Sequence, residues 1–341
     1  PDIVHCFGAE YPHTLAMCRI FPRKDRLLLG LQGLCTLIAR EYYADLPRRA
    51  IARVTLRDFL KRDSLERQRQ KFALRGDMER EALGLAGNVT GRTQWDRMHT
   101  KAWNPGARYH EMNESLRPQF YGPVWREEGC EPHSIFLSQG DYPLKGLHYM
   151  LLALPEILRD YPDAKVYVAG NSLVAYGTLK EKLKISGYGR YLRGLLAEHG
   201  LEERVVFLGK LDAAQMRDRY LKSHLYVCCS CLENSPNSLG EAMLLGMPCV
   251  CADVGGIPSI FTADVDGIMY KGHAPRGESE DSEEGGELEA VSGRLTEAVT
   301  RMWRNPGKME EYCRNARNHA LKTHDRERNY QKLVEIYGKI L

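Results

Sequence analysis

The sequence of 341 residues contains no apolar run long enough to cross a membrane. A spanning helix needs roughly 18 or more consecutive apolar residues, whereas the longest candidates here are interrupted by Arg, Asp or Gly. No secretory signal peptide opens the chain either, because residues 1–8 already have the pattern of a strand that runs into a loop. These absences favour a globular protein that is cytoplasmic or peripheral to the inner face of the membrane.

The chain also has no large excess of charge of one sign, since it contains 48 Lys and Arg and 45 Asp and Glu, which gives a net charge of +3. This balance gives no indication of a nucleic-acid partner. The charges are unevenly distributed, however. Residues 47–80 are dense in Arg and Lys, while residues 278–289 are acidic and carry Gly and Ser. The acidic stretch has too little apolar area to offset the cost of ordering, so we expect a surface loop there.

The basic segment at residues 47–80 also carries apolar residues at helical spacing: Leu56, Phe59, Leu60, Leu65 and Phe72. We interpret the segment as one or two amphipathic helices with a solvated charged face. The alternative is peripheral membrane contact, in which a basic helix holds the protein against anionic lipid.

The ten cysteines do not predict a disulfide framework, because a chain of this size without a secretory segment is expected to be reduced. Five of them cluster on two predicted neighbouring strands: Cys228, Cys229, Cys231, Cys249 and Cys251. That cluster raises the hypothesis of a zinc site. The alternative is that these thiols pack as small apolar groups in a buried sheet, where alternating residues point to opposite faces.

Strand and helix patterns alternate regularly from about residue 130 to residue 270. Such alternation predicts an α/β fold with a parallel, doubly wound sheet. Residues 1–129 show the pattern of a first Rossmann-like domain, and Gly and Pro near its end mark an interdomain linker. We therefore expect a second Rossmann-like domain at residues 130–318 and a terminal helix at residues 319–341.

Two carboxylates, Glu233 and Glu241, flank a polar loop at residues 234–240 that follows a strand and precedes a helix expected to begin near Glu241. Ligands of parallel sheets bind beyond the carboxyl ends of the strands, which is where Gly170, Gly209 and Glu233 fall. Because an ionised carboxylate accepts both hydrogens of a vicinal diol, Glu241 suits a ribose and Glu233 a sugar.

The same loop offers backbone N–H groups at the start of a helix, those of Asn237, Ser238, Leu239 and Gly240. Free N–H groups and the positive end of the helix dipole favour a phosphate there. For Glu241 the structural alternative is that an acidic residue in the first turn stabilises the helix. The combination nevertheless indicates nucleotide-sugar chemistry.

Residues 130–275 resemble the donor-binding domain of retaining glycosyltransferases of family 4. This family is part of glycosyl transferases group 1, and its members have the GT-B fold, which consists of two Rossmann-like domains. The resemblance is carried by five stretches in matching order, at residues 135–146, 164–170, 205–211, 233–241 and 246–256. It implies that the first domain is incomplete, lacking its early strands, and that the last helix crosses back onto that domain.

The resemblance further implies transfer of a hexose from a nucleotide-diphosphate sugar to a glycan or lipid-linked acceptor, with retention of configuration. Neither a metal nor a cofactor is required. Lys145 is expected to contact the diphosphate as a catalytic cation, while Glu233 binds sugar hydroxyls and supports the anomeric centre. The nucleobase is expected beside Gly209, Lys210 and Leu211.

The chain departs from the family pattern where an arginine often precedes the lysine, because Gln139 and Gly140 occupy that stretch. Part of the positive charge must come from elsewhere, and Arg92 is a candidate. The pair Asp264 and Asp266 is similar to the manganese-binding motif of another glycosyltransferase fold, but its surroundings predict a turn.

Two other functions are considered. A non-catalytic nucleotide- or carbohydrate-binding module of the same fold would need the same pocket without the chemistry. A dinucleotide-dependent oxidoreductase would need a G-x-G-x-x-G fingerprint after a first strand, and the glycines at residues 187–194 have the wrong spacing. The sequence does not choose the donor nucleotide, the sugar or the acceptor.

Overall fold

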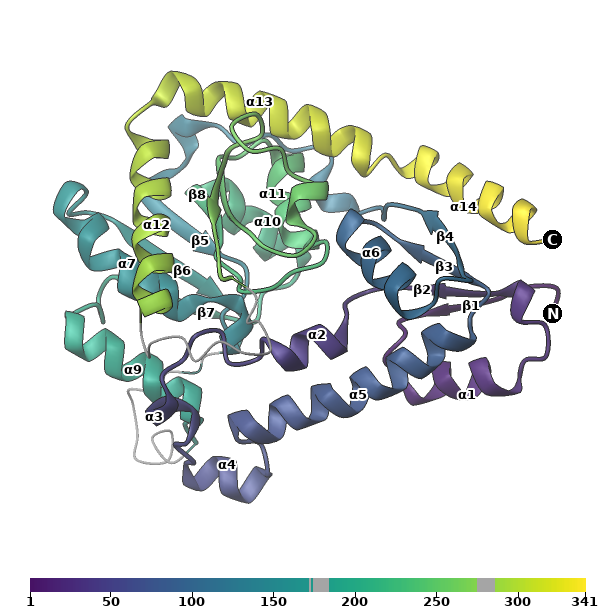
Figure 1. Cartoon of the computed structure of the whole chain (residues 1–341). Coiled ribbons are helices and arrows are strands. Elements are labelled where there is room, and N and C mark those ends of the chain that lie inside the picture. Colours follow the sequence, from purple (N-terminus) through teal and green to yellow (C-terminus); the bar gives the residue numbers. More distant parts are fainter. Residues whose placement is uncertain (172, 174–183, 275–285) are drawn as a thin grey trace.

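The computed structural model describes residues 1–171, 173, 184–274 and 286–341. Most of the acidic stretch predicted as a surface loop therefore lies outside the described residues. Within the described residues the chain forms two separate parallel sheets, one of four and one of six strands (Figure 1). The predicted α/β class with two parallel sheets is confirmed.

The first sheet has the strand order β1-β2-β3-β4, and all its pairs are parallel. Between β2 and β3 the chain forms four helices. In chain order the elements are β1 (Val4–Phe7), α1 (Pro12–Ile20), η1 (Lys24–Arg26), β2 (Leu27–Gly30), α2 (Cys35–Arg40), α3 (Arg48–Ile51), α4 (Leu56–Lys61), α5 (Leu65–Leu85), β3 (Asn88–Gly91), α6 (Gln94–Trp103) and β4 (Arg108–Glu111).

The second sheet has the order β10-β9-β8-β5-β6-β7, again with parallel pairs. Its elements are η2 (Pro118–Phe120), η3 (Glu127–Gly129), β5 (Glu131–Leu137), η4 (Pro143–Lys145), α7 (Leu147–Asp160), β6 (Lys165–Ala169), α9 (Gly187–His199), β7 (Val205–Gly209), α10 (Ala213–Lys222), β8 (Ser223–Cys228), α11 (Asn237–Leu245), β9 (Cys249–Asp253), η5 (Ile257–Ser259), β10 (Ile268–Lys271), α12 (Gly286–Trp303), α13 (Pro306–Thr323) and α14 (Arg326–Ile340).

The strand order reverses direction between β5 and β8. From β5 the chain adds β6 and β7 on one side, and it then returns to build β8, β9 and β10 on the other. Such a switch point leaves a crevice at the carboxyl ends of the two central strands, because their crossover helices lie on opposite faces. The topology therefore places a ligand site after β5 and β8.

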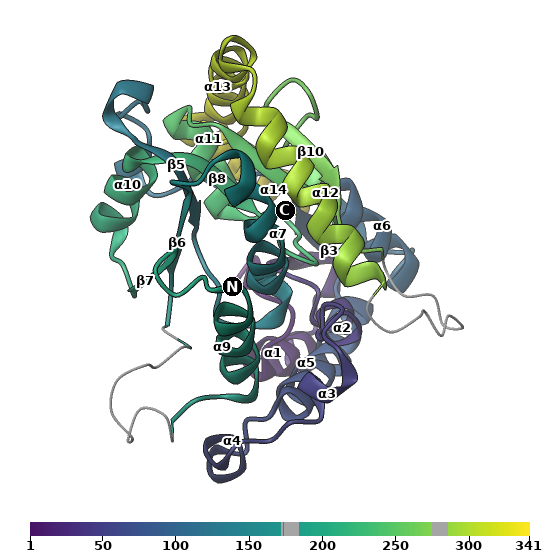
Figure 2. The ribbon, with the colours of Figure 1, turned by 90° about the vertical axis from the view of Figure 1, so that its left-hand side faces the viewer.

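Two segments connect the sheets. The large core around the second sheet includes Tyr42, Ala44 and Leu46, which follow α2 of the first part of the chain. In the other direction, Ile336 and Ile340 of α14 pack on Leu28 of β2. The terminal helix thus leaves the second sheet and lies beside the first, near both chain ends (Figures 1 and 2).

None of the described helices is long and apolar enough to cross a membrane.

Candidate functional site

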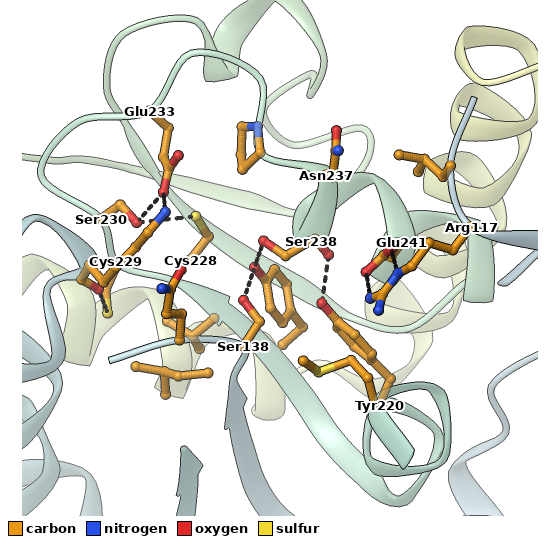
Figure 3. A pocket seen from close by; sticks show the side chains of 18 of the residues that line it. Arg117, Ser138, Tyr220, Cys228, Cys229, Ser230, Glu233, Asn237, Ser238 and Glu241 are labelled. Carbon is orange, nitrogen blue, oxygen red and sulfur yellow. Dashed lines mark hydrogen bonds and ion pairs between the residues drawn. The ribbon is translucent and has the colours of Figure 1, made fainter. Parts of the chain in front are cut away.

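A cavity of about 490 Å³ lies at the switch point, after β5 and β8 (Figure 3). The segment before η2 and the helices α10 and α11 complete its wall. Its lining is polar at two ends and consists of Ser115, Leu116, Arg117, Leu137, Ser138, Gln139, Lys145, Met216, Tyr220, Tyr226, Val227, Cys228, Cys229, Ser230, Glu233, Pro236, Asn237, Ser238 and Glu241. Three predicted residues from separate stretches of sequence, Lys145, Glu233 and Glu241, therefore share one cavity.

Lys145 and Glu233 form an ion pair at one end of this cavity. The ammonium nitrogen of Lys145 lies 2.5 Å from Glu233 Oε1, and the hydroxyl of Ser230 donates to the same oxygen at 2.7 Å. Burial by itself lowers the pKa of Lys145, but the charge and hydrogen bond of Glu233, together with Tyr142 and Cys228, outweigh burial, and the pKa is raised. Lys145 is therefore a permanent cation in the range of neutral pH.

The position of Lys145 depends on the glycine that follows it. Gly146 has φ of 71°, and a Cβ there would lie 1.8 Å from the carbonyl oxygen of Cys229. Only glycine permits this approach of η4 to the chain that leaves β8. The backbone N–H of Cys231 also donates to the Leu144 carbonyl at 2.8 Å. The lysine is thus fixed beside Glu233 by backbone contacts.

The second ion pair joins Arg117 to Glu241 at the opposite end of the cavity (Figure 3). The guanidinium donates two parallel hydrogen bonds of 2.6 and 2.7 Å to the carboxylate, the strong bidentate geometry. It also lies over the ring of Phe120, 4.8 Å from the centroid. Burial raises the pKa of Glu241, and Arg117 opposes this shift without cancelling it.

Arg117 was not singled out by the sequence analysis. It lies in an irregular segment between β4 and η2, where neither periodicity nor a motif marks it. The sequence instead predicts Arg92 as the source of the positive charge that the family pattern requires. Arg92 does not line the cavity, because it is buried and paired with Glu114 at 2.9 Å. Its guanidinium donates a hydrogen bond of 3.5 Å to Oδ1 of Asn237, which does line the cavity.

Helix α11 begins at Asn237 and not near Glu241, which corrects the predicted loop. The N–H groups of Leu239 and Gly240 already donate to the Pro236 carbonyl, at 3.0 and 3.3 Å. Those of Asn237 and Ser238 have no such partner among the described residues. Only two of the four predicted backbone donors are therefore available to a phosphate.

Two buried tyrosines, which the sequence analysis did not select, support this helix end. The hydroxyl of Tyr220 donates to the Ser238 carbonyl at 2.9 Å, and the hydroxyl of Tyr226 donates to the Ser238 side chain at the same distance. Ser138, after β5, approaches the Tyr226 hydroxyl at 3.4 Å. These contacts link the ends of β5 and β8 to the start of α11.

The remaining predicted donor-binding residues lie outside the cavity lining. Gly170 directly follows β6 and Gly209 ends the neighbouring strand β7, where the Gly170 N–H donates to the Gly209 carbonyl at 3.0 Å. Lys210 and Leu211 follow β7 directly. The structure thus keeps these four residues together at the carboxyl edge of the sheet, and their binding of the donor stays a prediction.

Metal ligands were considered at two places. Cys228 of β8 and Cys251 of β9 do face each other on neighbouring parallel strands, as the zinc hypothesis supposed. Yet among the described residues no group of three or more His, Cys, Asp or Glu side chains is placed to hold a metal. Asp264 and Asp266 lie in a turn, as predicted, and Asp266 accepts the N–H of Thr262 at 2.8 Å.

Comparison with known proteins finds a family model that is similar to part of this chain. Residues 127–282 match the sequence model of Glycosyl transferases group 1. An uncharacterized glycosyltransferase of Methanocaldococcus jannaschii is 31% identical over 36% of this chain and 28% of its own length. A putative glycosyltransferase of Bacillus subtilis, YtcC, is 21% identical over 65% of this chain and 52% of its own length. The chain thus spans only part of these curated relatives.

Solved structures give the fold. Sucrose-phosphate synthase of Thermosynechococcus elongatus superposes with a TM-score of 0.67 at 15% identity, over 99% of this chain and 73% of that one. HepE of Anabaena, in complex with UDP, superposes with a TM-score of 0.61 at 18% identity, over 99% of both chains. The chain therefore has the GT-B fold of these neighbours, and its residues 127–282 are similar to Glycosyl transferases group 1.

Proposed function

We propose that this chain binds a nucleotide-diphosphate sugar and transfers its hexose, with retention of configuration, to a hydroxyl of a glycan or lipid-linked acceptor. No metal takes part. The observation that carries the proposal is the cavity at the switch point, where two cations, two carboxylates and two helix N–H groups converge. HepE, which has been solved with UDP-glucose, supports the choice of donor. Another relative, a D-inositol 3-phosphate glycosyltransferase, supports the transfer.

The two ion pairs can open when a donor binds, because the donor offers new partners to both the cations and the carboxylates. Each carboxylate in the cavity holds a cation of the same chain, Lys145 on Glu233 and Arg117 on Glu241. A diphosphate competes for both cations, and the hydroxyls of the sugar and the ribose then replace the cations at the carboxylates. In this scheme the two cations neutralise the diphosphate, and each carboxylate keeps hydrogen-bond donors in the hydroxyls of the donor.

The same cations serve the chemical step. Cleavage between the anomeric carbon and the phosphate places growing negative charge on the leaving diphosphate. Lys145, Arg117 and the N–H groups of Asn237 and Ser238 stabilise this charge. Glu233, held by the Ser230 hydroxyl, supports the positive charge that develops at the anomeric centre. The leaving phosphate accepts the acceptor proton on the same face.

Donor binding tests the proposal directly. Thermal unfolding is measured with uridine, guanosine and adenosine diphosphate sugars, because a true donor raises the melting temperature by mass action. We expect one nucleotide class to stabilise the parent chain and to lose this effect in Glu241→Gln. Glu297→Gln, at an exposed position of α12, is the matched control. Unchanged donor affinity in Glu241→Gln would refute the proposed role of Glu241.

Turnover separates transfer from binding alone. A transferase of this fold slowly hydrolyses its donor or passes the hexose to an added acceptor, and the anomeric configuration of the product is read by NMR. Donor binding without either reaction would instead indicate the non-catalytic binding module. An inverted product would exclude retention while leaving the donor site intact.

A further inference from the structure

Helix α4 carries its apolar side chains on the outside of the protein. Leu56, Phe59 and Leu60 are 57%, 73% and 71% exposed, and the nearby Val54 and Leu74 are 56% and 65% exposed. We call these five residues the apolar tip. In both ribbon views α4 lies at the lower extremity of the molecule, away from the two sheets (Figures 1 and 2).

This arrangement differs from the amphipathic helices with a solvated charged face that the sequence favoured. Leu65 and Phe72 of α5 do pack inward, but α4 is held by its polar side. Asp58 is 2% exposed and accepts the N–H of Gly187 at 2.7 Å, and the Thr55 hydroxyl donates to the Ile185 carbonyl at 2.8 Å. With its polar face anchored on Ile185 and on the first residue of α9, the helix turns its apolar face to solvent.

Cations surround the apolar tip. Arg53, Lys61, Arg62 and Arg67 are exposed and have no ion-pair partner among the described residues. The acidic residues nearby do not balance them, because Asp58 is buried, and the carboxylate of Asp63 is shared by Arg57 and Lys71 at 3.2 Å each. The whole segment 47–80 holds 11 Lys and Arg against 5 Asp and Glu, a local net charge of 11 − 5 = +6.

The apolar and cationic side chains meet in one groove. Its volume is about 870 Å³, and its walls include Val54, Phe59, Leu60 and Leu74 together with the cations Arg62, Arg67 and Lys71. An apolar surface with a basic border is the pattern of a segment that lies in the boundary between lipid headgroups and acyl chains. Cations at that depth meet anionic headgroups, while the apolar side chains leave water.

We propose that the apolar tip and its cations dock the protein on an anionic lipid bilayer, with Phe59 and Leu60 inserted below the phosphate groups. Charge complementarity selects this partner. A second copy of the chain would bring two cationic tips together, and their mutual repulsion opposes such a contact. The docking does not depend on the proposed transferase activity, although it would bring a lipid-linked acceptor near the protein.

Vesicle co-sedimentation tests the proposal. The parent chain is mixed with vesicles of phosphatidylcholine alone or of phosphatidylcholine with phosphatidylserine. We expect binding to the anionic vesicles that weakens as salt is added. The double variant Phe59→Ser/Leu60→Ser should lose about tenfold in partitioning for each side chain removed. Substituting Lys61, Arg62 and Arg67 by Gln should lose roughly fivefold for each cation.

The matched control is Ile20→Ser/Met98→Ser, which removes two apolar side chains that are 72% and 57% exposed on α1 and α6. This variant should bind vesicles like the parent chain. Equal loss in the control and the tip variant, or no binding of the parent chain to anionic vesicles, would overturn the proposal. So would a concentration-dependent dimer, seen by sedimentation without vesicles, that the tip variant abolishes. The donor should raise the melting temperature of the tip variant as much as that of the parent chain. This measurement separates failure of docking from failure of the donor site.

Discussion

Two buried clusters of carboxylates, both paired with cations, differ in their access to solvent. In the cavity, Lys145 and Glu233 are 20% and 13% exposed, and Arg117 retains 41% exposure beside Glu241. In the junction between the two parts of the chain, His273 lies between Glu41 and Asp45, at 2.9 and 2.8 Å. All three junction side chains are no more than 6% exposed.

The junction cluster is enclosed by further hydrogen bonds. Tyr149 donates its hydroxyl to Asp45 at 2.8 Å, and the Nε2 atom of His148 lies 2.8 Å from the Ala44 carbonyl oxygen. Both partners lie on α7, so these hydrogen bonds tie the segment that carries Asp45 to that helix. The comparison teaches that a buried ion pair alone does not mark a binding site. The cavity pairs can exchange their cations for a ligand, whereas the junction cluster serves to hold two segments together.

Removing the junction cation should produce the largest change in stability. In His273→Gln, two buried carboxylates lose their counter-charge, and we expect the free energy of unfolding to fall by about 3–5 kcal/mol. Urea unfolding at neutral pH measures this loss. Donor affinity of the folded variant should remain within a factor of about two, since no junction residue lines the cavity. A variant as stable as the parent chain would remove the distinction between the clusters.

In contrast to His273→Gln, Lys145→Met should lower the transfer rate strongly and the free energy of unfolding only slightly. Its ammonium is proposed to meet the leaving diphosphate, so we expect the transfer rate to fall by about 10²–10³-fold, as for the loss of one transition-state donor. The free energy of unfolding should change less than in His273→Gln, because water reaches Glu233 through the cavity. Steady-state transfer assays and urea unfolding give the two values. Lys222→Met, at an exposed position ending α10, is the control, and an equal rate loss there would contradict the proposed role of Lys145.

Exchange of partners at the second ion pair can be tested by a double-mutant cycle. Arg117→Gln and Glu241→Gln should each weaken donor binding by about 10–100-fold, because one contact to the diphosphate or to the ribose is lost. If each group has its own contact on the donor, the double variant should show losses that multiply. Isothermal titration measures the three affinities. An affinity equal to that of the parent chain in Arg117→Gln would show that this arginine only neutralises Glu241.

The sequence predicted the sheets better than it predicted the site. Strand and helix periodicity identified the parallel sheets, and the rule for strand ends brought Glu233 to the cavity that the structure shows. Arg117 could not be predicted as a site residue, because its position depends on how an irregular segment packs against α11. The start of α11 was misplaced for a related reason: Gly240 lies inside the helix, where a Cβ would come within 2.7 Å of His324. That contact is between residues distant in sequence, so no local pattern reveals it.

The smallest expected effect is the pH dependence of the difference in stability between the parent chain and His273→Gln. Burial by itself lowers the pKa of His273, but hydrogen bonds to Asp45, Cys231 and Glu41 outweigh it and raise the pKa to about 12. The unfolded chain releases this proton near pH 6.5, while the folded chain keeps it. The stabilisation is therefore fully present below about pH 6.5 and is lost as the pH rises toward 12, by at most about 1.4 kcal/mol per pH unit. Urea unfolding between pH 6 and 9 should show the parent chain losing its advantage over His273→Gln, whereas a constant difference would mean that His273 is neutral in the folded protein.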